Sequence, residues 1–133
     1  MFGSMERDDE ERVYAEYRER SRNLSRFDAI EPPQFAGLTG CIYPLHITDE
    51  VRSYLIPLCN LALDKYNTEE GTNFVFVDIL KSTHQGVAGT NYFITFQAKY
   101  PYGPLVTFQA YVFVKLPCYG GQPVVQSCAI KPT

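Results

Sequence analysis

The sequence contains no tryptophan and only two histidines, His46 and His84, among its 133 residues. A histidine-based active site therefore has two candidates. Cys41 lies close to His46 in the sequence, but no base or oxyanion site can be assigned to it. The segment Gly86–Gly89 lacks the lysine and the following helix of a phosphate-binding loop. Two histidines and scattered acids also make a poor metal site. We therefore expect no enzymatic activity, no metal and no cofactor.

Long apolar runs are also absent. The longest, residues 74–77 and 111–114, fall far short of the roughly 18–20 residues that cross a bilayer. The first ten residues contain no apolar stretch of the kind found in a secretory signal. We therefore expect an intracellular protein, cytoplasmic or nuclear, that does not bind membranes.

The chain also lacks a stripe of basic residues. Residues 1–31 hold six Arg and nine acids, and the other 102 residues hold six basic and six acidic groups, so the net charge of −3 arises in the first quarter. Without a basic stripe, binding to a nucleic-acid backbone is not expected. We predict a charged N-terminal extension over residues 1–34, partly disordered or helical, which ends at Pro32-Pro33. A single domain over residues 35–133 follows it.

The four cysteines lie too far apart for a zinc ribbon or a redox motif, and free thiols are expected. A turn at Gly120-Gly121 would place Cys118 opposite about residue 123 and Cys128 opposite about residue 113, beyond disulfide reach of each other. We therefore predict no bond between Cys118 and Cys128.

The domain is predicted to begin with one helix, over about residues 48–66. Thr48 is a suitable N-cap, and apolar residues follow at helical spacing. Pro57 predicts a kink, or a second helix that begins there.

After Gly71 the apolar period changes from 3.6 to 2, which predicts four strands over about residues 73–83, 90–99, 105–115 and 123–131. The phase slips near Asp78, which indicates a bulge. Residues 84–89 form the first connector, and Thr95 is expected on the solvent side. The residues expected to face inward from the last strand are Val124, Cys128 and Ile130. Together these elements predict an α+β domain with an antiparallel sheet across one helix.

The connector Gln85-Gly86-Val87-Ala88-Gly89 differs from an ordinary polar turn, because it carries apolar side chains at its tip. Its two glycines allow positive φ angles and close approach of another backbone. An exposed apolar tip on a rigid hairpin fits a surface that docks into a cleft. The alternative is an ordinary hairpin with Val87 folded back onto the sheet.

This segment resembles the Gln-x-Val-x-Gly loop of cystatins, a family of inhibitors of papain-like cysteine proteases. Its context is similar too: a helix ending Leu61–Asn67 precedes it, and Gly89–Phe93 resembles the family's next strand. The strand Tyr111–Lys115 and the ending Ala129–Pro132 also fit, so the resemblance covers about residues 37–132. In the helix, four of nine restricted positions of the plant cystatin motif match, which suggests a divergent plant cystatin-related protein; the matching residues are Leu58, Ala62, Tyr66 and Asn67.

The resemblance implies a cystatin-like fold, with a four- to five-stranded antiparallel sheet wrapped across one helix. It also implies reversible occlusion of a protease cleft by a wedge made of an N-terminal segment and two hairpin loops. The residues that would form this wedge are Gly37, Gln85, Gly86, Val87, Ala88, Gly89, Leu116, Pro117 and Tyr119. Gly40 competes with Gly37 for the N-terminal position. The second loop lacks the family's tryptophan, and Tyr119 would replace part of its contact.

A second hypothesis is a non-inhibitory cystatin-fold interaction module of a plant cell, which uses the charged extension to bind its partner. The extension could also fold back over the wedge. Cystatin folds can exchange hairpins between chains, so both a monomer and a hairpin-swapped dimer are open.

Overall fold

The computed structural model describes residues 7–34 and 40–132. The predicted boundary at residue 35 and the candidate Gly37 lie outside these ranges. No helix in the described ranges has the length and apolar character needed to cross a membrane. The elements, in chain order, are α1 (Arg7–Ser21), η1 (Arg26–Asp28), β1 (Ile42–Leu45), α2 (Asp49–Glu70), β2 (Val75–Val87), β3 (Gly89–Lys99), β4 (Leu105–Val114), η2 (Pro117–Tyr119) and β5 (Pro123–Ile130).

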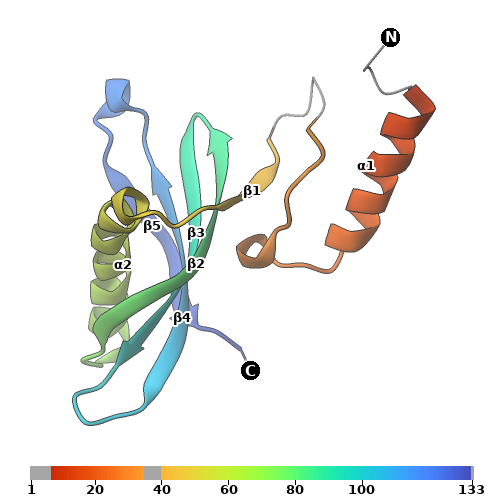
Figure 1. The fold of residues 1–133 in the computed structure, drawn as a ribbon. Helices are drawn as coiled ribbons and strands as arrows, with labels where there is room; N and C mark the ends of the chain where they lie inside the picture. Colours follow the sequence, from red (N-terminus) through yellow and green to blue (C-terminus); the bar gives the residue numbers. More distant parts are fainter. Residues whose placement is uncertain (1–6, 35–39, 133) are drawn as a thin grey trace.

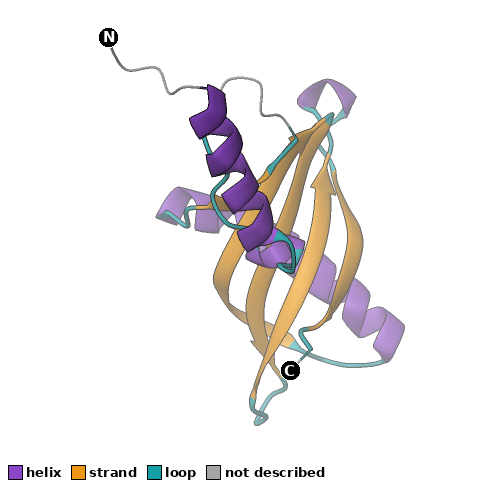
Figure 2. Cartoon of the chain, turned by 90° about the vertical axis from the view of Figure 1, so that its right-hand side faces the viewer, coloured by secondary structure: helices purple, strands orange, loops and turns teal. Residues whose placement is uncertain are grey.

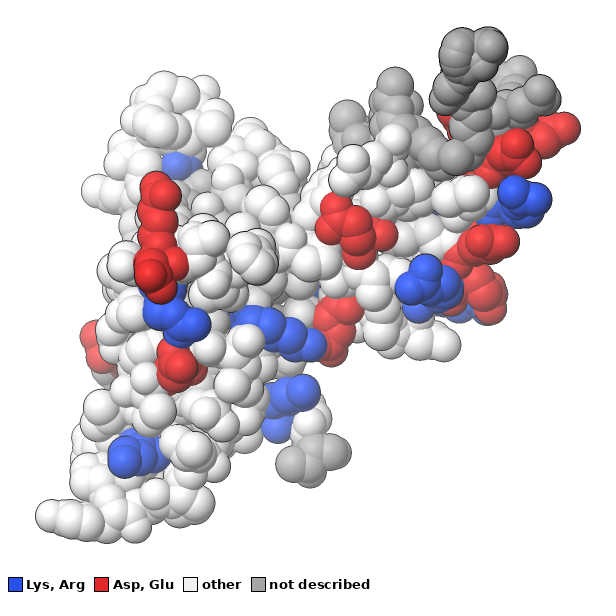
Figure 3. Space-filling view, in the orientation of Figure 1, with Lys and Arg blue, Asp and Glu red and all other residues white. Residues whose placement is uncertain are grey.

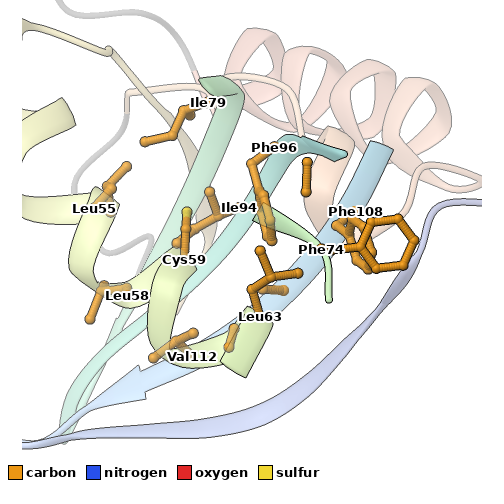
Figure 4. Packing of buried hydrophobic residues seen from close by; sticks show 13 residues of the cluster. Leu55, Leu58, Cys59, Leu63, Phe74, Ile79, Ile94, Phe96, Phe108 and Val112 are labelled. Carbon is orange, nitrogen blue, oxygen red and sulfur yellow. The ribbon is translucent and has the colours of Figure 1, made fainter. Parts of the chain in front are cut away.

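The strands form one five-stranded antiparallel sheet in the order β1-β2-β3-β4-β5, and α2 packs across one of its faces (Figure 1). The predicted fold class is therefore confirmed. The core lies between α2 and this face (Figure 4), as the alternating apolar residues of the strands require. Its best-buried members include Leu55, Cys59, Ile94, Phe96, Phe108 and Val112.

Helix α2 is one continuous helix of 22 residues that contains Pro57, so the predicted second helix does not form. The Thr48 hydroxyl accepts a hydrogen bond from the Val51 backbone N–H (3.2 Å), which confirms the predicted N-cap. At the other end Gly71 adopts the left-handed conformation that commonly ends helices.

The end of α2 is joined to the start of β2 by the side chain of Asn67. Its amide donates to the Phe74 carbonyl (2.9 Å), and its oxygen accepts from the Phe74 N–H (3.0 Å) and the Thr72 hydroxyl (2.8 Å). These partly buried bonds fix the angle at which the chain leaves the helix and enters the sheet.

We expect Asn67→Ala to lower the free energy of unfolding by about 2–3 kcal/mol, because three partly buried hydrogen bonds are lost and two backbone groups of Phe74 lose their partner. Urea unfolding would measure the change. Thr68→Ala is the control, since that neighbouring side chain is exposed. Equal stability of the two variants would contradict a structural role for Asn67.

The bulge predicted near Asp78 is confirmed by register shifts between β2 and β3 at Phe76/Asp78 and Ile79/Lys81. The Asp78 carboxylate accepts a hydrogen bond from the Ile79 N–H (2.8 Å) and pairs with Arg52 of α2.

The connector predicted over residues 84–89 was wrong in length, because residues 84–87 continue β2 and leave Ala88 alone between the strands. The tip at Ala88 is therefore held by strand pairing on both sides.

The inward face predicted for β5 was partly wrong. Val124 and Ile130 are exposed, whereas Val125 and Cys128 pack against the core. A register shift between Tyr111 and Val112 places Val125 instead of Val124 on the core face. Ile130 keeps the phase of Cys128, opposite the buried Phe108, but it is exposed on this edge strand. Cys128 lies opposite Ala110 rather than residue 113, because the β4–β5 connection is centred near residues 118 and 119, with Val114 opposite Pro123, and not at Gly120-Gly121. All four cysteines are free.

The N-terminal extension lies on the outer face of the sheet, opposite α2 (Figure 2). Phe27 of η1 packs edge-on against Phe93 (ring centroids 5.7 Å apart), and Asp28 pairs with Lys81. This ion pair and hydrogen bond lower the pKa of the Asp28 carboxyl. On the same face Thr95, which was expected to face solvent, is buried. The sheet is therefore covered on both faces over part of its area.

Candidate functional site

Three segments meet at one end of the sheet, at the top of Figure 1. They are the hairpin between β2 and β3, the connection between β4 and β5, and the residues just before β1. The strand register requires this, since Ile42 pairs with Gln85 and Thr90 pairs with Val114. The structure thus brings together the two loops predicted for the wedge.

The first of these segments is the hairpin Gln85–Gly89. Val87 pairs with Gly89 and its side chain is 48% exposed, so it projects into solvent and the folded-back alternative is wrong. Gly89 has φ +124°, and a Cβ there would lie 2.5 Å from the Val114 carbonyl oxygen. Only glycine fits this position, because the turn needs both the backbone angle and the close approach to β4.

The second segment contains the short helix η2 within residues 115–122. The Gly121 N–H donates to the Leu116 carbonyl (3.0 Å), and the Gly120 N–H donates to the Pro117 carbonyl (3.0 Å). This compact turn leaves Tyr119 73% exposed, with Leu116 and Pro117 also on the surface. The loop therefore presents an aromatic side chain beside the first hairpin.

The third segment is the N-terminal limb, Gly40 and Cys41. Gly40 has φ +74°, and its carbonyl accepts a hydrogen bond from the Gln85 side-chain amide (2.8 Å). Gly40 is therefore the glycine of the described chain that lies against the first hairpin. A groove of about 280 Å³ separates this limb from Tyr17 of α1. The extension thus flanks the limb and leaves Val87 uncovered.

Two residues that the sequence did not single out hold Gln85 in place. The Asn91 amide donates to the Gln85 side-chain oxygen (3.1 Å), and the Tyr111 hydroxyl donates to the Asn91 oxygen (3.3 Å). The sequence did contain a signal for the contact between Asn91 and Gln85, because a hairpin turn centred on residue 88 places residue 91 opposite residue 85. The Tyr111 contact depends on the register of a further strand.

The three segments carry almost no charge. Lys115 is the one charged residue within residues 40–42, 85–90 and 114–122. Figure 3 shows the contrast with α1, where charged side chains gather. Burial lowers the pKa of the neighbouring His84, so its imidazole is neutral at pH 7. Burial also raises the pKa of Tyr92 to about 12. The surface at this end is therefore neutral and partly apolar.

Such a surface is suited to binding. Within residues 7–34 and 40–132 no group of three or more His, Cys, Asp and Glu side chains is placed to hold a metal ion. The apolar tip, the exposed tyrosine and the backbone of the glycines can instead fill a groove in another protein.

A family model described as the cystatin domain matches residues 44–116, which is more than half of the chain. The matched range includes α2, the first hairpin and the start of the second loop, and it excludes the extension and the N-terminal limb. No curated protein matches the chain.

Proposed function

Because the chain belongs to the cystatin family, a family of inhibitors without enzymatic activity, we propose that it inhibits papain-like cysteine proteases. Inhibition is by reversible occlusion of the active-site cleft, and the wedge is the part that enters it. The observation that carries this proposal is the exposed Val87 at the tip of a paired hairpin, next to the second loop and the N-terminal limb.

The rigid loops of the wedge and their neutral surface support this function. Both loops are closed by backbone hydrogen bonds, so little conformational entropy is lost when they dock. Their neutral surface also loses little favourable hydration on burial, whereas charged side chains would lose much more.

We assign the N-terminal part of the wedge to Gly40. Its carbonyl contacts Gln85, and a flexible residue is needed where the chain leaves the hairpin to follow a cleft. Gly37, the other candidate, lies outside the described residues.

A titration of papain with the full chain tests the proposal. We expect competitive, reversible inhibition at micromolar concentration or below. Full papain activity in the presence of micromolar folded protein would rule the function out.

The second loop is expected to contribute through Tyr119. We expect Tyr119→Ala to weaken papain binding about tenfold, because an exposed aromatic anchor is removed. The matched control is Tyr102→Ala, since Tyr102 is another exposed tyrosine but lies in the β3–β4 turn at the other end of the sheet. Inhibition constants of the two variants give the comparison. Equal constants would show that the second loop makes no contact.

A second candidate function is a non-inhibitory interaction module inside a plant cell. The absence of tryptophan from the second loop and the exposed, charged helix α1 favour it. In α2, the four restricted positions that match the plant motif support plant origin, and the five that do not match support divergence from standard inhibitors. Failure of the papain titration would favour this module.

We propose that the chain acts as a monomer or as a hairpin-swapped dimer. Sedimentation of the full chain separates the two, and a swapped dimer would bury the first hairpin and lose inhibition.

A further inference from the structure

The extension touches the sheet through an unusual arrangement around Arg26. The guanidinium carbon of Arg26 lies 4.9 Å from the ring centre of Phe93 and 4.8 Å from that of Tyr111. The backbone at this point is also held, because the Thr83 hydroxyl donates to the Arg26 carbonyl (2.6 Å). One cation therefore covers two aromatic rings that stand on neighbouring strands, with their centroids 4.7 Å apart.

Tyr111 is also the first member of a chain of hydrogen bonds that ends at the wedge. Its hydroxyl donates to Asn91, Asn91 donates to Gln85, and Gln85 donates to the Gly40 carbonyl. These hydrogen bonds lead from β4 through β3 and β2 to the N-terminal limb.

The direction of each bond follows from the bond before it. An amide side chain has one accepting end and one donating end. When the Tyr111 hydroxyl occupies the Asn91 oxygen, the Asn91 amino group faces Gln85. The oxygen of Gln85 is then occupied, so its amino group is the end that faces Gly40. Fixing the Tyr111 ring thus fixes the contact between the first hairpin and the limb.

We infer that Arg26 is a positioning residue for the wedge, which acts through Tyr111, Asn91 and Gln85 on Gly40. Its consequence for protease binding rests on the proposed function, but the positioning itself does not. The segment that supplies Arg26 lies outside residues 44–116, so this control belongs to the part of the chain that the family model does not match.

The other contacts of η1 differ from this one in a way that can be tested. Phe27 contacts Phe93, and Asp28 pairs with Lys81; within the described chain neither contact involves a member of the hydrogen-bond chain. Lys81→Ala therefore loosens the extension without touching Tyr111. It is the matched control for Arg26→Ala.

The first experiment follows the side-chain amide resonances of Gln85 and Asn91 by NMR in the full chain. We expect Arg26→Ala to shift both pairs of resonances and to speed exchange of the Gln85 amide protons with water. Lys81→Ala should leave them in place. Arg26→Lys should fall between, because lysine keeps the charge but lacks the planar group that stacks on rings. Unchanged Gln85 and Asn91 resonances in Arg26→Ala would overturn the inference.

The second experiment measures dissociation of the complex with papain. We expect Arg26→Ala to raise the dissociation rate constant about two- to fivefold. In an Asn91→Ala background the same change should have no further effect, because the series of hydrogen bonds from Tyr111 to Gly40 is already interrupted at Asn91. Equal effects of Arg26→Ala in both backgrounds would overturn the inference. If the unchanged protein does not inhibit papain, the proposed function fails while the resonance test still decides the positioning role.

Discussion

Gly89→Ala is expected to lower the free energy of unfolding by about 3 kcal/mol or more, which is a large loss for a substitution that adds one methyl group. The new Cβ would lie 2.5 Å from the Val114 carbonyl oxygen and 2.7 Å from the ring of Phe113. The backbone oxygen cannot move without breaking the pairing of β3 with β4. The φ of +124° adds strain for any side chain. Urea unfolding followed by circular dichroism measures the loss.

The matched control is Gly86→Ala in the same hairpin. A Cβ at Gly86 meets nothing within 4 Å, and this glycine is not among those with positive φ. We expect its stability to be unchanged or raised by up to about 1 kcal/mol, since alanine restricts the unfolded chain. Equal stability of the Gly86→Ala and Gly89→Ala variants would show that the close approach to β4 is not tight.

Val87→Asp is expected to weaken inhibition of papain about 100-fold or more, while thermal stability stays nearly unchanged. The side chain is half exposed at the hairpin tip, so the folded state accepts a carboxylate there. In the proposed complex the same carboxylate would lose its water in an apolar contact, and the removed valine would be an anchor of the docked hairpin. The inhibition constant and the melting temperature are the two measurements.

Leu80→Asp provides the comparison for this change. Leu80 lies in the same strand with a similar exposure, 51%, but seven positions before the tip. We expect it to inhibit as well as the unchanged chain. If both aspartate variants lose inhibition equally, the loss comes from charge or folding, and the first hairpin is not the docking element.

Periodicity was enough to predict most of the fold. The apolar spacing of α2 and the alternation in β3 and β4 report which residues face the core, and Leu55, Phe96 and Phe108 are fully buried as that pattern requires. The pattern failed at β5, because a single register shift exchanged Val124 for Val125. A shift of this kind depends on contacts between strands, and no local sequence signal marks it.

The docked extension could not be predicted for a different reason. Arg26 and Phe27 belong to no helical or alternating pattern, and their partners lie more than 50 residues away in the chain. The outer face of the sheet looked solvent-facing because Thr95 alternates with core residues. Only the tertiary contact with η1 explains why Phe93 is buried on that side.

The first hairpin was predictable, since its apolar tip and its glycines are local features. The contact of Gly40 with this hairpin was not predictable, because it depends on the pairing of β1 with β2. That pairing sets Ile42 opposite Gln85 and brings Gly40 to the amide.

The docked segment also bears on how the protein is handled in the laboratory. Phe93 is fully buried, and Phe27 and Arg26 supply part of its cover. A shortened chain that starts near Pro33 would leave an aromatic patch on the outer face open to water. Such a fragment would tend to precipitate or adhere to other proteins. If such a fragment inhibited poorly, low solubility would explain the result as well as an altered wedge would. Single substitutions are therefore the cleaner probe of this segment.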